Sequence, residues 1–529
     1  MSRSSSAKLE PGKPGSPEGM NAQAVAAQGK PPVVTSEGTI RSGRLKGLTM
    51  WQAIWVLSWP ILIESFLNAL VGLVDTTLAA SLSEAATDAV GAASYFLWFI
   101  SLVGMALGVG VTALVSRSMG KGRVAAASAA VGQSTLMSLG AGLLVALLIS
   151  FAAPGIASLL QLQEEAREGA ISYLRILAFG VPAQTFLLCG IAACRGAGDA
   201  FRPLMIMAVI NFVNVVLSFL LSGANFGMTR TNAGGEVVTD VLVPGFDAFQ
   251  MGINGIAWGT VIAWNLGAVL MALLLIRGTH GVRLMLKRIK PHKITMGRLI
   301  RISIPSGIET FGMWFGNFLI IMIVGSFAMQ GLLGSHIVAI RIEAFSFLPG
   351  FAMSMAASTL AGQYLGAGSP RLAKMAIFRC TAISASIMFC FGVLFITLGK
   401  QITGLFSQQP THLELVPKLL FICGITQIPF AISICIRGSL RGAGDTRMVM
   451  MLTWVSTYAI RLPLAYFCSG VDLTILGQIY ENPLPILDLL FGIEPGLVGL
   501  WIALCGEHVT RALLFMGRFF QGGWVHVKV

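Results

Sequence analysis

Charged residues are scarce in this sequence. They make up 11% of the 529 residues, whereas hydrophobic residues make up 55%. An average soluble domain carries about 25% charged residues, and a water-exposed surface of this size needs comparable charge to cover it. The scarcity excludes a soluble, fibrous or disordered protein for most of the chain and predicts the lipid bilayer as a partner.

Several motifs that carry chemistry are also missing. No Walker A sequence Gly-x-x-x-x-Gly-Lys-Ser/Thr occurs, which disfavours an ATP-driven pump within this chain. The eight cysteines contain no Cys-x-x-Cys and lie in or beside apolar segments, so neither a metal site nor a disulfide framework is expected. Six scattered histidines with no nucleophile–base arrangement disfavour an enzyme. We expect no cofactor. The net charge of +13 falls in short loops instead of a basic domain, so no nucleic-acid partner is expected.

Apolar segments occupy most of the chain after the first 47 residues. Each is long enough to cross a hydrocarbon core of ~30 Å as a helix. They lie at 51–80, 90–115, 125–150, 170–192, 203–222, 252–276, 298–327, 336–362, 374–398, 417–437, 447–468 and 496–520. The prediction is an all-α membrane protein with twelve transmembrane helices.

The distribution of Lys and Arg predicts the orientation of these helices. Loops on one side carry only Arg167, Arg175, Arg230, Lys400 and Lys418, whereas the N-terminal segment, the opposite loops and the C-terminus carry most of the others. The positive-inside rule places both termini in the cytosol, as expected for a multi-pass protein of the plasma (inner) membrane.

Two halves of the chain repeat each other. The repeat predicts two six-helix lobes related by a pseudo-twofold axis along the membrane normal, because an even number of crossings returns the chain to the same side, as in some secondary transporters. The repeat rests on Arg195-Gly-Ala-Gly-Asp199 recurring as Arg441-Gly-Ala-Gly-Asp445, and on Pro60 and Glu64 recurring as Pro305 and Glu309. The predicted domains are a disordered cytosolic tail (1–47), an N-terminal lobe (48–276), a basic linker (277–297), a C-terminal lobe (298–520) and a cytosolic C-terminus (521–529).

The motifs, taken in order, resemble those of the multidrug and toxic compound extrusion (MATE) transporters over about residues 48–525. The resemblance is carried by Val74-Asp75-Thr76, by the doubled Arg-Gly-Ala-Gly-Asp turns, by Gly362–Ala367, by Arg461–Tyr466 and by Gly517-Arg518-Phe519 with Trp524. It implies an antiporter that exchanges inward H+ or Na+ for an outgoing, usually cationic and amphipathic small molecule through a V-shaped pair of lobes. We expect a monomer.

Two other functions are compatible with twelve spans in two halves. A lipid-linked saccharide flippase of the same general architecture is the alternative, although five acids in the spans, set against Arg341 and Arg461, disfavour the cationic cavity of such flippases. A non-transporting receptor predicts no substrate-dependent ion flux.

Asp75 is the first candidate for coupling transport to a cation. A carboxylate at membrane depth can hold a proton or ligate Na+, and Asp75 matches the first-segment aspartate that binds the coupling cation in the family. The resemblance adds Asn214, Ser218 and Thr260 to the site. Asn214 and Thr260 offer neutral oxygens that suit Na+ together with Asp75, whereas Ser218, where the family often has a second carboxylate or an asparagine, favours H+. The alternatives are a helix-capping role for Asp75 and helix–helix hydrogen bonds for Asn214 and Thr260.

Other polar residues in the spans have two interpretations each. Glu64, Asn68 and Glu309 are predicted to line a cavity, with interhelical bonding as the alternative. Pro60 is either a hinge or an inert kink. Arg341, Glu343, Arg461 and Glu507 are predicted to form structural ion pairs, with Arg461–Glu507 as one candidate. The second lobe has Met313 and Pro429-Phe430-Ala431 where some members of the family have carboxylates, so coupling is assigned to the N-terminal lobe.

Overall fold

The computed structural model describes residues 44–45, 47–159, 164–231, 237–246, 249–327, 331–475, 478–480, 482, 496–527 and 529. The predicted tail (1–47) lies almost entirely outside these residues.

Long apolar helices make up the described chain. The first half contains α2 (Met50–Leu82), α3 (Glu84–Gly120), α4 (Val124–Leu159), α5 (Glu164–Ala178), α6 (Val181–Gly196), α7 (Phe201–Ser222) and α8 (Ile253–Arg277). The second half contains α9 (Lys293–Gly325), α10 (Leu332–Gly366), α11 (Pro370–Phe406), α12 (Pro410–Ile425), α13 (Gln427–Gly442), α14 (Thr446–Trp454), the π-helix η2 (Val455–Arg461), α15 (Leu462–Ser469) and α17 (Leu497–Gln521). In the described part of the chain, 10 helices could cross a membrane, or 12 if each of two bent pairs is one span, which agrees with the twelve predicted segments.

The bent pairs occupy equivalent places in the two halves. α5 and α6 meet at 53°, and α12 and α13 meet at 58°. Pro182 and Pro429 lie within the first three residues of α6 and α13. Proline lacks a backbone N–H and fits best in the first turn of a helix, so each proline favours a new helix start at this point. Each bent pair therefore corresponds to one predicted segment.

Two β-hairpins were not predicted from the sequence. β1 (Phe226–Thr231) pairs with β2 (Val237–Val243), and β3 (Leu473–Ile475) pairs with β4 (Gln478–Tyr480), both antiparallel. They lie in the long loops 223–251 and 469–495, each of which follows the equivalent helix of its half. The all-α prediction holds for the spans, and only these loops depart from it. We call the side of the bundle that carries these loops the hairpin end.

The opposite end carries the repeated glycine turns, and we call it the glycine-turn end. Gly198 and Gly444 have φ of +90° and +89°, a backbone region that residues with a Cβ rarely adopt. The two turns thus have the same conformation as well as the same sequence. They connect α6 to α7 and α13 to α14.

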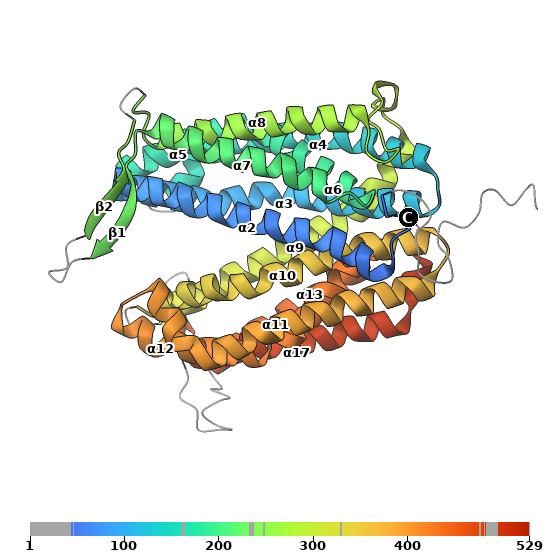
Figure 1. The fold of residues 1–529 in the computed structure, drawn as a ribbon. Coiled ribbons are helices and arrows are strands. Elements are labelled where there is room, and N and C mark those ends of the chain that lie inside the picture. The colour runs from blue at the N-terminus through green and yellow to red at the C-terminus, as the bar shows by residue number, and fades with distance from the viewer. Residues whose placement is uncertain are drawn as a thin grey trace, which may run out of the picture.

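The helices form two groups, α2–α8 and α9–α17, which lie one above the other in Figure 1. Hydrogen bonds between the groups, within the described residues, lie at the glycine-turn end: Gln363 Nε2 donates to Gly196 O (3.1 Å) and Arg117 Nη2 to Ala443 O (3.1 Å). A shared apolar core joins the first half of α2 to α10 and includes Leu57 and Tyr364. The two lobes are therefore held together at the glycine-turn end.

The basic linker between the lobes is folded onto α4. Gln133 Nε2 donates to the backbone oxygens of Arg288 (2.9 Å) and Lys290 (2.8 Å), and Gln133 Oε1 accepts from His292 N (2.9 Å). The second lobe begins at Lys293, five residues before the predicted boundary.

Candidate functional site

The structure brings together the four residues of the predicted cation site. Asp75 lies on α2, Asn214 and Ser218 on α7, and Thr260 on α8. Asn214 Nδ2 donates to Thr260 Oγ1 (3.0 Å), and the Asp75 carboxylate interacts with the Ser218 hydroxyl. Asp75 is seven residues from the end of α2 and Thr260 seven from the start of α8, so both lie about 10 Å from the helix ends at 1.5 Å per residue. The site is inside the first lobe, on the side of the hairpin end.

Two oxygens of this site are buried and have no hydrogen-bond partner in the described part of the chain. They are Asp75 Oδ1 and Asn214 Oδ1. A buried oxygen without a partner is costly, and carboxylate and amide oxygens are good ligands for hard cations. The residues present therefore fit Na+ at Asp75, Asn214 and Thr260, and a proton on Asp75 would instead remove the buried negative charge. Asp75 does not cap a helix, because α2 continues to Leu82 and ends on Ser83.

Two further residues border this site. Asn211 Nδ2 donates to Asn68 Oδ1 (3.1 Å), which joins α7 to α2 one turn from Asn214. Tyr173, on α5, is buried and lies within electrostatic reach of Asp75. Asn68 is thus bonded between helices. Tyr173 was not predicted, because nothing in the local sequence distinguishes it from a core aromatic residue.

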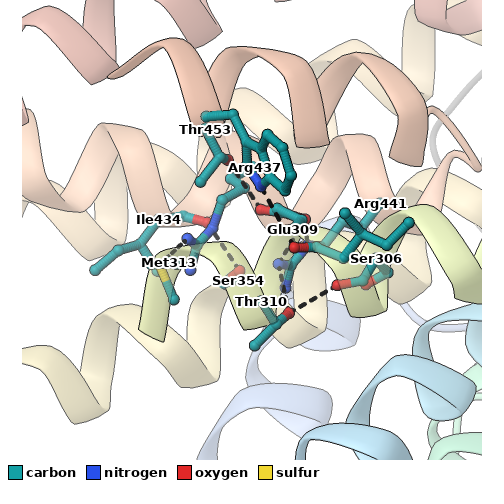
Figure 2. A network of polar contacts seen from close by, with 11 residues as sticks. Ser306, Glu309, Thr310, Met313, Ser354, Ile434, Arg437, Arg441 and Thr453 are labelled. Carbon is teal, nitrogen blue, oxygen red and sulfur yellow. Dashed lines mark hydrogen bonds and ion pairs between the residues drawn. The ribbon is translucent and has the colours of Figure 1, made fainter. Parts of the chain in front are cut away.

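Glu64 and Glu309 form equivalent buried ion pairs. Glu64 Oε2 lies 2.6 Å from Arg195 Nη2, and Glu309 Oε2 lies 2.7 Å from Arg441 Nη2. Thr453 Oγ1 donates to the second oxygen of Glu309 (2.9 Å), as Figure 2 shows. Cavity lining is therefore corrected to interhelical bonding for both glutamates. The arginines are the first residues of the two Arg-Gly-Ala-Gly-Asp turns, so each turn holds the glutamate at Pro+4 in its own lobe.

The aspartates that end these turns are also paired. Asp199 contacts Arg44 and lies 3.5 Å from Arg202 and 3.6 Å from His280, and Asp445 lies 2.8 Å from Arg518. Burial raises the pKa of the Asp445 carboxyl above its ordinary value, and Arg518 opposes that rise. The aspartates of the glycine turns thus join neighbouring helix ends of each lobe by ion pairs.

Three of the four predicted structural charges behave differently from expectation. Within the described residues, neither Arg341 nor Glu343 forms an ion pair, and the same is true of Arg461. Arg341 is exposed, so a long side chain can reach out of the bundle without a partner. Glu507 pairs with Arg511 (2.8 Å), one turn further along the same helix, in place of Arg461.

The assignment of charges to the spans from the sequence was incomplete. Arg511 lies in the middle of α17, and Arg437 lies on α13 next to α9, where its Nη1 donates to Met313 Sδ (3.2 Å). The spacing of four residues between Glu507 and Arg511 is the signal for a helical ion pair that could have identified Arg511. When Arg437 and Arg511 are added to Arg341 and Arg461, the acids no longer clearly outnumber the arginines in the spans. The charge balance therefore no longer argues against a flippase.

Pro60 lies where α2 changes its surroundings. Leu57 and Ile61 share the core that joins α2 to the second lobe, whereas Leu78 and Ala79 belong to a core of the first lobe. α2 is continuous through Pro60. The hinge role stays a prediction.

The fold and the site define a multi-pass membrane protein built of two related helical lobes, with a polar site inside the first. The MatE family model matches residues 60–220 and 305–467, the equivalent part of each lobe. The chain belongs to the MatE family of membrane transporters, the family that its motifs resemble.

Two relatives of this chain are named as multidrug resistance proteins. It is 24% identical over 473 residues to the probable multidrug resistance protein NorM of Thermotoga maritima, covering 88% of this chain and 92% of that protein. It is 24% identical over 465 residues to the multidrug resistance protein PmpM of Pseudomonas aeruginosa, covering 87% and 91%. Among solved structures, a MOP superfamily transporter from Pyrococcus furiosus has the same fold, with a TM-score of 0.76, 19% identity and coverage of 94% of this chain and all of that one.

Proposed function

We propose that this protein is a secondary antiporter that exports amphipathic, cationic drugs or metabolites in exchange for H+ or Na+ by alternating access. The observation that carries the proposal is the site formed by Asp75, Asn214, Ser218 and Thr260, with its two unpartnered buried oxygens. We also propose that it acts as a monomer in the plasma (inner) membrane, with the glycine-turn end and both termini in the cytosol. This orientation rests on the distribution of Lys and Arg.

The contacts between the lobes support alternating access. In the described chain, the hydrogen bonds between the lobes cluster at the glycine-turn end. In the proposed orientation this is the cytosolic side, so a compound would leave from the opposite, outer side. A proton or Na+ that enters from outside neutralises the charge of Asp75 in its apolar surrounding. The desolvation free energy of that charge is several kcal/mol, and its loss can shift the position of α2 relative to α7.

The test is transport in proteoliposomes with pH and Na+ gradients imposed separately, using a cationic dye such as ethidium. Asp75→Asn should reduce gradient-driven dye flux at least tenfold while the protein remains in the membrane. Asp88→Asn is the matched control, because Asp88 is an exposed carboxylate of the same lobe. Flux that follows neither gradient contradicts antiport, and undiminished flux in Asp75→Asn contradicts the coupling role.

A further inference from the structure

Arg437 is a guanidinium within the membrane-spanning part of the second lobe, and it has no carboxylate partner among the residues that the structure describes. Its only hydrogen bond in the described structure runs from Nη1 to Met313 Sδ, a weak acceptor. The side chain is neither fully buried nor fully exposed. Figure 2 shows it on the face of α13 that meets α9, beside the Glu309–Arg441 pair. A guanidinium has five N–H donors, so most of its hydrogen-bonding capacity is unused.

The acids near Arg437 are already committed to other arginines. Arg437 lies within electrostatic reach of Glu309 and Glu507. Glu309 is taken by Arg441 and Thr453, and Glu507 by Arg511 and Ser456. Arg461 is another guanidinium of this lobe without an ion pair in the described residues, and it lies within electrostatic reach of Glu343, Glu507 and Arg511. The cluster therefore has more positive charge than its carboxylates neutralise.

The internal repeat indicates that the fold does not require this charge. With the repeat shift of 246, Arg437 corresponds to Ile191 of the first lobe (437 − 246 = 191), and Ile191 is buried in an apolar core. With the shift of 244 found in the last helix of each lobe, Glu507 and Arg511 correspond to Ala263 and Gly267. The equivalent helices of the first lobe pack with uncharged residues at these positions. Helix packing alone therefore does not explain the charges of the second lobe. An intramembrane charge without a partner usually has a function.

Aromatic side chains surround the same part of α9. Tyr458 Oη donates to Gly312 O (2.7 Å), next to Met313, and Trp454 Nε1 donates to Ile308 O (3.3 Å) one turn earlier. The rings of Trp454 and Tyr458 are 5.7 Å apart, and Trp454 is 39% exposed. An amphipathic molecule can place its apolar body against such rings while a guanidinium holds its polar group.

We propose that Arg437 binds the anionic group of a transported amphipathic compound. The group is a sulfonate, carboxylate or phosphate, since Arg recognises these through paired N–H donors. This inference deepens the proposed function, on which it rests for the transport step, by extending the substrates to zwitterionic and anionic amphiphiles. The first lobe would hold the coupling cation and the second lobe the anionic group, so the two sites are separate.

The test uses two probes with the same fluorescent body and opposite charges, dansyl-taurine (anionic) and dansyl-choline (cationic), bound to the protein in phosphatidylcholine nanodiscs. Arg437→Gln should weaken dansyl-taurine binding about tenfold or more, as expected for loss of a charge-assisted hydrogen bond, with dansyl-choline changed less than twofold. Arg437→Ile, which introduces the residue of the equivalent position, should behave in the same way and remain folded. The control Arg371→Gln removes an exposed charge at the start of α11 and should bind both probes as the unmodified protein does.

Dansyl-taurine affinity within twofold of the unmodified value in both Arg437 variants overturns the proposal, as does an equal loss in Arg371→Gln. Nanodiscs containing one fifth phosphatidylglycerol separate two sources of the anion: competition by this lipid identifies a lipid headgroup, and unchanged affinity identifies a free compound. Binding needs no ion gradient, so failure of coupling in Asp75→Asn leaves this proposal standing. Conversely, loss of the anion site leaves coupled efflux of ethidium standing.

Discussion

The buried pair between Glu309 and Arg441 allows a quantitative prediction. Glu309 has no exposed surface and accepts hydrogen bonds from Arg441 Nε (2.9 Å) and Thr453 Oγ1 (2.9 Å), and its Oε2 lies 2.7 Å from Arg441 Nη2. Replacing Glu309 by Gln leaves the Arg441 guanidinium, whose side chain is only 12% exposed, without its counter-charge. Removing one partner of a buried pair costs about 3–5 kcal/mol in the free energy of unfolding. We expect Glu309→Gln to lose an amount in this range.

The double variant gives the opposite expectation. Replacing both partners, with Glu309→Gln and Arg441→Met, removes the uncompensated charge, and well-packed apolar replacements of buried pairs are often neutral. The loss in the double variant should therefore be about 1–2 kcal/mol, far below the sum of the two single losses. The exposed pair Glu414–Lys418 (3.4 Å) is the control, and Glu414→Gln should cost less than about 1 kcal/mol.

The assay is unfolding of the purified protein in mixed micelles with increasing SDS, followed by tryptophan fluorescence. A loss below about 1 kcal/mol in Glu309→Gln, or a double variant as unstable as the sum of the singles, would refute the reasoning. Either result would mean that the pair is hydrated or replaced by other contacts.

Two further predictions concern the glycine-turn end. A Cβ on Gly362 would lie 1.9 Å from Ser116 Oγ of the other lobe, so Gly362→Ala should force the lobes apart at this end. The distance between spin labels placed on the two lobes there should increase, and adding Ser116→Gly should restore it. An unchanged distance in Gly362→Ala alone would argue against close contact between the lobes. Removing Arg518 leaves the Asp445 carboxyl with only the burial that raises its pKa. A folded-state pKa above the unfolded value gives stability that is present at low pH and lost as pH rises through it, so the melting temperature of Arg518→Gln should fall more between pH 4 and pH 8 than that of the unmodified protein. Parallel pH dependence in both proteins would exclude Asp445 as the titrating group.

Much of the fold can be predicted from the sequence because hydropathy is a local signal. A stretch of about 20 apolar residues has to be a helix in lipid, since its backbone groups can bond only to one another there. The twelve segments and the two halves follow from that signal and from the repeated motifs. The bends at Pro182 and Pro429 and the two hairpins follow from turns and strand pairing, which the hydropathy profile does not show.

The candidate cation site was predicted from its motifs, whereas the charge pairs were not. Asp75, Asn214, Ser218 and Thr260 lie together as expected. Arg461 was one candidate partner of Glu507, which pairs instead with Arg511 one turn further along the same helix. Glu64 and Arg195 are 131 residues apart, and Glu309 and Arg441 are 132 apart. The recurrence of both members of each pair at nearly the same shift (245 and 246 residues) was a signal for their contact.

The sequence by itself determined that this protein is an α-helical membrane protein of two repeated halves with a carboxylate in its first span. Charge scarcity and repeat spacing are properties of the chain and need no contacts. Only the tertiary structure decided which charges neutralise one another and which, like Arg437, are left without an ionic partner. That outcome depends on distances of a few ångströms between helices far apart in sequence, because ion pairs in an apolar surrounding form only where the side chains meet.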